Sequence, residues 1–111
     1  MLDIGENLHI DVIQDDEEYE YYVWDEDFSR ILAYALVEKL NGSVKIQVIN
    51  VASDFRNNGI GSRLLARILE DFADFEIFAY TFEDRIAWYQ RHGFEVVDKH
   101  GQLFKMIRLA S

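Results

Sequence analysis

The sequence predicts an α+β domain built on one mixed β-sheet, in the order β-β-β-β-α-β-α-β-β with one central parallel strand pair. Three patterns support this prediction. Apolar residues alternate along the first half of the chain, they recur at helical spacing further on, and a short apolar run follows that helix. A strand–helix–strand order implies a parallel pair within the sheet. With 111 residues, the chain has room for a single domain over residues 1–111.

The first four strands are expected at residues 8–14, 19–24, 30–40 and 44–51. Apolar and polar side chains alternate in the first, and the second is rich in aromatic residues. The third segment also suits a helix, because several of its apolar residues recur at helical spacing. However, an Asn-Gly pair follows it and leads into the fourth strand-like segment, which favours a β-hairpin.

The second half of the chain begins with a predicted helix and a predicted central strand. Residues 60–72 carry apolar side chains at three- and four-residue spacing, as an amphipathic helix does. Residues 75–82 are apolar on both faces. This pattern predicts a strand that is buried on both sides.

A second helix and two final strands complete the predicted domain. The segment from Thr81 to Asp84 resembles a capping box and predicts a helix that runs through His92. Gly93 follows it, where a left-handed residue commonly ends a helix. Strands are expected at 94–98 and 103–109, joined by a turn at His100-Gly101.

The net charge of −10 is concentrated toward the N-terminal end. Residues 1–27 contain eleven acidic residues and no Lys or Arg, whereas the remainder has ten acidic and eleven basic residues. Nucleic-acid binding is therefore not expected, because phosphate contacts need basic residues. The acidic segment fits either a solvated loop or a surface that attracts a cationic substrate.

Several classes of protein are excluded by what the sequence lacks. It contains no cysteine, which excludes disulfides, thiolate metal sites and cysteine nucleophiles. The three histidines show no metal-ligand spacing, so no metal site is expected. No apolar run approaches the roughly 18 residues of a membrane span. Residues 1–6 lack the features of a secretory signal, so we expect a cytoplasmic protein.

The junction between the fourth strand and the first helix is the most informative motif. Helix N-termini present free N–H groups and partial positive charge, and glycines let an anion approach the backbone closely. Asparagine tolerates the left-handed geometry of such a turn, and an arginine adds charge-assisted bonds. The pattern predicts a pyrophosphate site, although glycines at a helix start also fit simple turn chemistry. The residues are Arg56, Asn57, Asn58, Gly59, Ile60, Gly61 and Ser62.

Two segments of the chain resemble the Gcn5-related N-acetyltransferases, in the order that this family shows. Residues 51–65 are similar to its coenzyme A-binding motif, which reads Arg or Gln, two residues, Gly, one residue, then Gly or Ala. Residues 86–95 are similar to a later helix of the family, where an Ala, an aromatic-Tyr pair and a Gly-Phe recur. The order of strands and helices also agrees from about Tyr19 to Leu109. The resemblance implies an acyl-coenzyme A N-acyltransferase-like fold.

The resemblance further implies acetyl-coenzyme A as the cofactor, bound where two parallel strands splay apart. Backbone groups near Ile49 and Val51 would pair with the pantetheine arm, and an N–H near Asn50 would polarise the thioester carbonyl. The backbone amides from Arg56 through Ser62 would hold the pyrophosphate. Asp84 stands where the family often carries an Asn near the cofactor, and its charge would repel phosphate.

Tyr89 falls at the position of the family's general acid, which protonates the leaving thiolate. A phenol keeps its proton at neutral pH, because its ordinary pKa is about 10. Tyr89 also fits an ordinary core position, three residues from Ile86. For the general base the candidates are Glu38 and a carboxylate of residues 15–18, although Glu38 also fits an exposed hairpin position. His92 is expected to be a surface residue that stabilises its helix end.

Members of the family usually carry two helices between their first two strands, where this chain has only residues 15–18. The acceptor side is therefore expected to be open or closed by a second subunit. The aromatic residues Tyr19, Tyr21, Tyr22 and Trp24 would then serve a homodimer interface. The expected function is transfer of an acetyl group from acetyl-coenzyme A to a primary amine, with a cationic acceptor such as a polyamine or a lysine side chain. The alternative is a non-catalytic acyl-coenzyme A-binding regulatory or interaction module.

Overall fold

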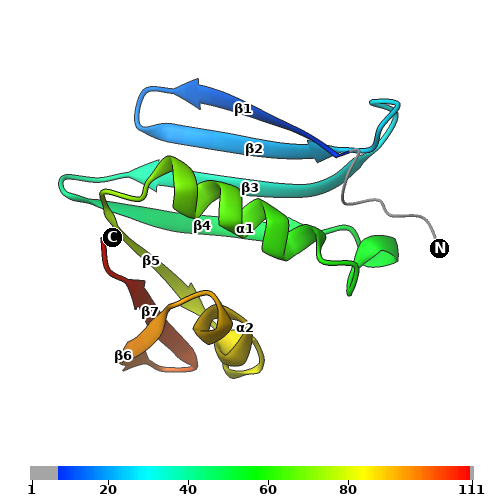
Figure 1. Ribbon diagram of the computed structural model, residues 1–111. Coiled ribbons are helices and arrows are strands. Elements are labelled where there is room, and N and C mark those ends of the chain that lie inside the picture. The colour runs from blue at the N-terminus through cyan, green and yellow to red at the C-terminus, as the bar shows by residue number, and fades with distance from the viewer. Residues whose placement is uncertain (1–7, 111) are drawn as a thin grey trace.

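The structure is a computed structural model that describes residues 8–110. Residues 1–7, on which the expectation about a secretory signal rests, and residue 111 lie outside this range. One seven-stranded sheet has the order β1-β2-β3-β4-β5-β7-β6, and its helices lie against it (Figure 1). The predicted α+β architecture is confirmed, including the strand expected at 30–40. In chain order the elements are β1 (His9–Asp15), β2 (Glu18–Trp24), β3 (Ile31–Lys39), β4 (Ser43–Val51), a 3-10 turn (Ser53–Phe55), α1 (Ile60–Asp71), β5 (Glu76–Thr81), a second 3-10 turn (Glu83–Arg85), α2 (Ile86–Arg91), β6 (Glu95–His100) and β7 (Leu103–Arg108).

Strands β1 to β4 form an antiparallel meander whose side chains divide between the two faces of the sheet. Successive residues of a strand point to opposite faces. In β3, Ala35 and Val37 are therefore fully buried, while Tyr34 and Glu38 lie on the other face. The β3–β4 register shifts between Leu36 and Val37, as a β-bulge does. Such a shift bends the strand at this level.

The parallel strands β4 and β5 pair only over their first residues. The ladder joins residues 43–46 of β4 to residues 76–79 of β5. Beyond this point β4 continues to Val51 with β3 as its partner, and β5 continues to Thr81 with β7 as its partner. The two strands therefore splay apart, as the family resemblance implies, and within residues 8–110 no strand pairs with this edge of β4 beyond Ile46.

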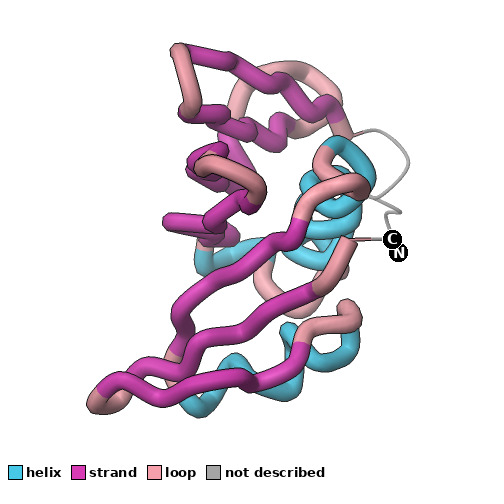
Figure 2. The backbone as a smooth tube through the Cα atoms, turned by 90° about the vertical axis from the view of Figure 1, so that its left-hand side faces the viewer, coloured by secondary structure: helices cyan, strands magenta, loops and turns pink. Residues whose placement is uncertain are grey.

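Both helices lie on one side of the sheet, and the core fills the space between (Figure 2). The apolar stripe of α1 faces the strands because its residues recur at helical spacing. Tyr89 of α2 and the inward side chains of the strands complete this core. No helix within residues 8–110 has the length and apolar character of a membrane span. The buried residues of α1 are Ile60, Leu64, Leu65 and Ile68.

The opposite face of the sheet, called the open face here, is not covered by any helix of the described chain. On β5, Ile77 and Ala79 are buried, but Tyr80 is 37% exposed. Phe82, just past the strand, is 58% exposed. The expectation that residues 75–82 are buried on both faces is therefore wrong. The strand is central in the sheet, yet helices pack on one of its sides alone.

The aromatic residues of β2 do not form a single surface. Tyr21 is fully buried and Tyr19 packs against the core. Tyr22 and Trp24 alternate with them and are half-buried. The expected interface of four aromatic residues is therefore wrong, because the two-residue period of a strand sends neighbours to opposite faces.

The start of α2 differs from the expectation, whereas its end agrees. Glu83–Arg85 form a 3-10 turn, and no side chain of residues 8–110 caps this turn or α2 with a hydrogen bond. The expected capping box at Thr81 to Asp84 is therefore absent, because Thr81 is buried as the last residue of β5. Gly93 has a φ of 89°, which confirms the left-handed end of the helix.

Candidate functional site

The loop between β4 and α1 enters the helix through two left-handed residues. Asn57 has a φ of 68°, and Gly59, the N-cap residue of α1, has a φ of 78°. This geometry is open to glycine and tolerated by asparagine, whereas most other residues are strained in it. The residue types of the motif therefore match the backbone conformation that the loop adopts.

The start of α1 presents several free backbone N–H groups. Within residues 8–110, no N–H of residues 56–62 donates a hydrogen bond to another protein group. The first bonded amide is that of Arg63, which donates to the carbonyl of Gly59 at 3.0 Å. No side chain of the described residues caps the helix. Free amides and the helix dipole together favour an anion at this position.

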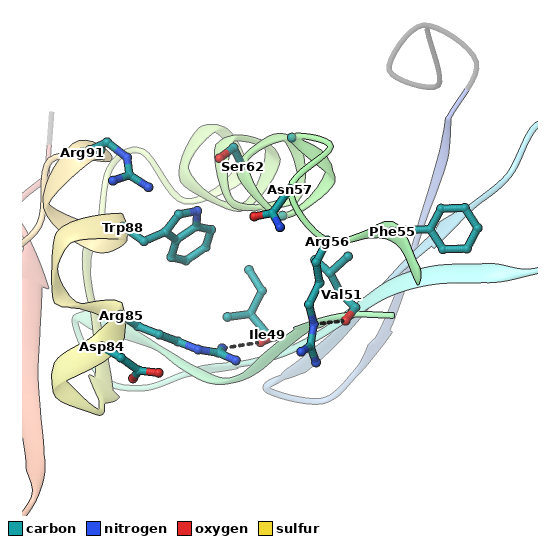
Figure 3. Close-up of a pocket in the computed structure, with 12 residues that line it drawn as sticks. Ile49, Val51, Phe55, Arg56, Asn57, Ser62, Asp84, Arg85, Trp88 and Arg91 are labelled. Atoms are coloured by element: carbon teal, nitrogen blue, oxygen red, sulfur yellow. Dashed lines mark hydrogen bonds between the residues drawn. The ribbon is translucent and has the colours of Figure 1, made fainter. Parts of the chain in front are cut away.

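A cavity of about 450 Å³ lies in front of these amides, beside the unpaired edge of β4 (Figure 3). It brings together most of the site residues expected from the sequence, which are Ile49, Val51, Arg56, Asn57, Gly59, Gly61, Ser62 and Asp84. Three further expected residues do not line it, namely Asn50, Asn58 and Ile60. The cavity thus joins the end of β4 to the glycine-bearing loop, as the resemblance implies.

Four residues that line the cavity were not expected from the sequence as site residues. They are Phe55, Arg85, Trp88 and Arg91. Arg85, Trp88 and Arg91 are spaced three residues apart, from the 3-10 turn before α2 to the end of that helix. Residues three apart lie on the same helical face, so this spacing was the available signal.

Gly61 allows α1 and α2 to approach β4 closely. A Cβ atom at this position would lie 3.2 Å from Cγ2 of Val51 and 3.6 Å from Cζ2 of Trp88. A side chain here would therefore crowd the cavity wall. The requirement for a small residue at this position is steric, whereas at Gly59 it comes from the backbone conformation.

Three arginines surround the cavity, and they give it positive charge (Figure 3). Arg56, Arg85 and Arg91 form no ion pair with a carboxylate of residues 8–110, where the observed pairs involve other groups. The acidic residue among those that line the cavity is Asp84. Unpaired guanidinium groups beside free amides suit a phosphate-bearing ligand.

The unpaired edge of β4 turns the main-chain groups of Ile49 and Val51 toward the cavity. The amide of Ala52 donates to the carbonyl of Leu32 on β3 at 2.8 Å. Because these groups alternate in direction along a strand, the backbone of Asn50 also faces β3. Ile49 and Val51 are therefore the residues that offer main-chain groups to a ligand at this edge.

Tyr89 lies behind the cavity wall. Its side chain is 3% exposed and packs edge-on against Trp88 and Phe94, with ring centroids 5.0 and 5.2 Å away. Burial raises the pKa of Tyr89 to about 12, and the positive charge of Arg85 opposes that rise. The phenol therefore keeps its proton at neutral pH. Its role as an acid stays a prediction, because Trp88 is the residue of this pair that lines the cavity.

The carboxylates considered as the general base lie away from the cavity. Glu38 is paired with Lys45 near the end of β3, and its Oε1 accepts a hydrogen bond of 2.8 Å from Gln47. The β1–β2 turn lies nearby, since the carbonyl of Glu17 accepts the amide of Lys39 at 2.7 Å. Figure 1 shows that these strand ends and the start of α1 lie at two different ends of the sheet. Within residues 8–110, no group of His, Asp or Glu side chains is arranged to hold a metal ion.

His92 connects the two helices. Its Nε2 lies 3.2 Å from Oγ of Ser62, and its ring lies 5.2 Å from that of Trp88. Burial lowers the pKa of His92, and the charge of Arg91 lowers it further. His92 is thus half-buried between the helices, where a surface residue at the helix end was expected, and its surroundings favour the neutral form of the ring.

The fold and the site combine a cavity, free backbone amides and an unpaired strand edge, which suit a phosphate-bearing ligand with an extended arm. Residues 17–96 match the family described as the acetyltransferase (GNAT) domain. The chain belongs to this family, so the resemblance seen in the sequence is confirmed. Comparison with curated protein sequences gave no significant match.

Solved structures of acetyltransferases share the fold. The PaiA N-acetyltransferase from Thermoplasma acidophilum, in complex with coenzyme A, is 16% identical with a TM-score of 0.73, over 84% of this chain and 61% of that one. An acetyltransferase from Thermus thermophilus is 16% identical with a TM-score of 0.76, over 86% and 66%. An acyl-CoA N-acyltransferase from Pseudomonas aeruginosa is 22% identical with a TM-score of 0.71, over 86% and 70%. The chain thus spans less than two thirds of the Thermoplasma and Thermus proteins.

Proposed function

We propose that the chain is a cytoplasmic, acetyl-coenzyme A-dependent N-acetyltransferase that acts on a primary amine carried by a cationic acceptor. The observation that carries the proposal is the cavity beside the unpaired edge of β4. There the free amides at the start of α1 and three arginines face one opening. A diphosphate suits the amides and arginines, and an extended arm with amide groups suits the strand edge.

The residues of the cavity have separate parts in holding this cofactor. The amides of residues 57–62 and the guanidinium of Arg56 would bind the diphosphate. The main-chain groups of Ile49 and Val51 would pair with the arm. When bound, acetyl-coenzyme A supplies an acetyl group activated as a thioester, whose C–S bond breaks as the acetyl carbon bonds to the amine nitrogen. The backbone of Asn50 faces β3. We therefore propose that the N–H of Ile49 donates the hydrogen bond that polarises the thioester carbonyl.

Tyr89 is the proposed proton donor to the leaving sulfur. Burial holds its pKa near 12, so the phenol is protonated before transfer begins. Its ring packs directly against Trp88 on the cavity wall. Since Glu38 is bonded to Gln47 outside the cavity, we propose that the amine loses its proton to solvent.

The acceptor is proposed to approach from the open face of the sheet. This face carries Glu20, whose Oε2 accepts hydrogen bonds from the hydroxyls of Tyr22 and Tyr34 at 2.8 and 2.9 Å. Tyr34 lies opposite Asn50 in the β3–β4 register, beside the split. A carboxylate next to two aromatic rings suits an ammonium group through charge and cation–π attraction. The acidic N-terminal part of the chain adds long-range attraction for a cation.

A second copy of the chain is the proposed cover for part of the open face. Tyr80, Val48 and Ile13 are 37%, 36% and 53% exposed there. Exposed apolar side chains on one face commonly mark a contact surface. Sedimentation at micromolar concentration tests the proposed homodimer, and a single species of 13.1 kDa would refute it.

The test of the proposed activity combines binding with turnover. Calorimetry with acetyl-coenzyme A should show binding at a single site, and thiol release should follow when an amine is added. Suitable amines are 1,5-diaminopentane and a lysine whose α-amino and carboxyl groups are blocked, with propanol as a neutral control. If acetyl-coenzyme A does not bind, the proposal is wrong.

A non-catalytic acyl-coenzyme A-binding module is the second candidate function. The observation that favours it is the position of Tyr89 behind Trp88, together with the position of Glu38 outside the lining of the cavity. In an enzyme that uses Tyr89 as its acid, Tyr89→Phe should lower kcat by roughly 10² to 10⁴ with cofactor affinity unchanged. In a binding module, no amine releases thiol from either protein, although both bind the cofactor.

A further inference from the structure

Arg56 and Arg85 occupy the two carbonyl groups that the unpaired edge of β4 turns toward the cavity. Nη1 of Arg85 donates to the carbonyl of Ile49 at 3.5 Å, and Nε of Arg56 donates to the carbonyl of Val51 at 3.2 Å. Figure 3 shows Arg85 reaching from the α2 side of the cavity to the strand. The open edge of β4 is thus held by two guanidinium groups in place of a neighbouring strand.

A ligand that pairs with this edge competes for the same two carbonyls. Ile49 and Val51 are two residues apart, so their carbonyls point the same way, as the acceptors of an added strand do. The side chain of Arg85 spans the gap along which such a ligand would lie (Figure 3). Pairing therefore requires the guanidinium groups to leave.

The displaced arginines have a better partner close by. They form no ion pair with a carboxylate of residues 8–110, and the free amides of the α1 start mark the nearby position of an anion. Charge-assisted bonds from arginine to phosphate are roughly twice as strong as bonds to a neutral carbonyl. A phosphate in the cavity would therefore draw the guanidinium groups away from the strand.

We propose that Arg85, together with Arg56, exchanges partners on ligand binding, from the β4 carbonyls to the phosphates, and so selects the phosphate-bearing coenzyme over its bare arm. This inference rests on the proposed function, since it assumes that coenzyme A occupies the cavity. An arm without phosphates has to displace both arginines with nothing to receive them. Coenzyme A displaces them and supplies their new acceptor in the same step.

The test compares coenzyme A with pantetheine, which has the arm but no phosphate. Calorimetry is carried out on the wild-type protein and on Arg85→Ala. The exchange predicts opposite effects in the variant. Coenzyme A should bind about tenfold more weakly, because a charge-assisted phosphate bond is lost. Pantetheine should bind about threefold more tightly, because one competitor for the Ile49 carbonyl is gone.

Arg91→Ala is the matched control. Arg91 lines the same cavity and carries the same charge, but it makes no hydrogen bond to a β4 carbonyl in the described chain. Its loss should weaken coenzyme A binding while leaving pantetheine binding unchanged. Arg85→Met, which keeps an apolar stem without donors, should repeat the result of Arg85→Ala and replaces it if the alanine variant does not fold.

The outcomes separate the exchange from the function on which it rests. The exchange is supported if the Arg85 variants bind pantetheine more tightly and coenzyme A more weakly than the wild type does, while Arg91→Ala does not bind pantetheine more tightly. If pantetheine binds these variants equally or more weakly while the wild type still binds coenzyme A, the exchange is wrong and the proposed function stands. If the wild type does not bind coenzyme A, both are wrong.

Discussion

The hydroxyl of Tyr21 donates a hydrogen bond of 2.8 Å to Oδ2 of Asp71, and so joins strand β2 to the last residue of α1. Arg67 donates to the same carboxylate at 3.1 Å from one turn earlier in the helix. Tyr21 is fully buried, so its hydroxyl depends on this partner. The bond secures the far end of the helix whose first turn presents the free amides.

The first prediction concerns this bond. Tyr21→Phe removes one hydroxyl from the core and leaves the packing of the ring. The free energy of unfolding should fall by about 1–2 kcal/mol, because a partly buried hydrogen bond to a charged group is lost. Urea denaturation measures it. Tyr22→Phe is the control, since Tyr22 is only half-buried and bonds to Glu20, and it should lose clearly less. Equal losses in both variants would contradict the role given to Asp71.

The strands and the loop before α1 could be predicted because each depends on a local pattern. Alternation identifies β1 to β4 wherever one face is buried, and left-handed geometry at Asn57 and Gly59 follows from the residue types. The burial of residues 75–82 could not be predicted from their own pattern. Apolar side chains on both faces do not show whether a second layer exists to cover them.

The far wall of the cavity could be predicted less well, because it depends on how α2 docks against the rest of the chain. Arg85 bonds to Ile49, which lies 36 residues away in sequence. The spacing of Arg85, Trp88 and Arg91 shows that they share a helical face, but not that this face meets the edge of β4. Likewise, the aromatic residues of β2 show that side chains alternate between two faces, but not which of the two faces is buried.

The second prediction concerns stability at alkaline pH. Burial raises the pKa of Tyr21 far above its usual range, and the bond to Asp71 raises it further. Burial also raises the pKa of Tyr89 to about 12. Unfolded tyrosine titrates near 10, so above this pH the unfolded chain releases protons that the folded chain retains. Stability is therefore complete below about pH 10 and falls as the pH rises toward 12, by about 1.4 kcal/mol per pH unit for each tyrosine.

Urea titrations between about pH 9 and about pH 11.5 measure this slope. Tyr89→Phe should make it shallower by about 1.4 kcal/mol per pH unit, because one tyrosine whose pKa is raised in the folded protein is removed. The two proteins differ at this one residue, so the contributions of all other groups cancel in the comparison. An unchanged slope would show that Tyr89 titrates normally in the folded protein, and would remove the basis for its protonated state.

The third prediction concerns the acidic residue in the cavity. Asp84→Asn removes the negative charge among the lining residues and retains a side chain of similar size. Coenzyme A should bind about two- to fivefold more tightly at low salt, with a smaller gain at high salt, where charges are screened. Calorimetry at two salt concentrations measures this. Glu83→Gln makes the same charge change one residue earlier, at a position that does not line this cavity. It should increase the affinity for coenzyme A less than Asp84→Asn does. A gain that is equal in both variants would show a general charge effect rather than a contact in the cavity.

The fourth prediction tests the open face as the acceptor side. Glu20 accepts both tyrosine bonds on Oε2, and its Oε1 accepts no hydrogen bond from residues 8–110, so that an ammonium group can bind there. Glu20→Gln retains an oxygen acceptor for Tyr22 and Tyr34 but removes the charge. The KM for 1,5-diaminopentane should rise about tenfold, as expected when one charge-assisted bond is lost, while the KM for acetyl-coenzyme A stays the same. Glu18→Gln removes the same charge two residues earlier on the same face. No tyrosine hydroxyl of residues 8–110 is bonded to Glu18, so this variant should change neither constant by more than about twofold. If the two variants behave alike, the acidic strand attracts the acceptor only through its overall charge, and Glu20 does not bind it.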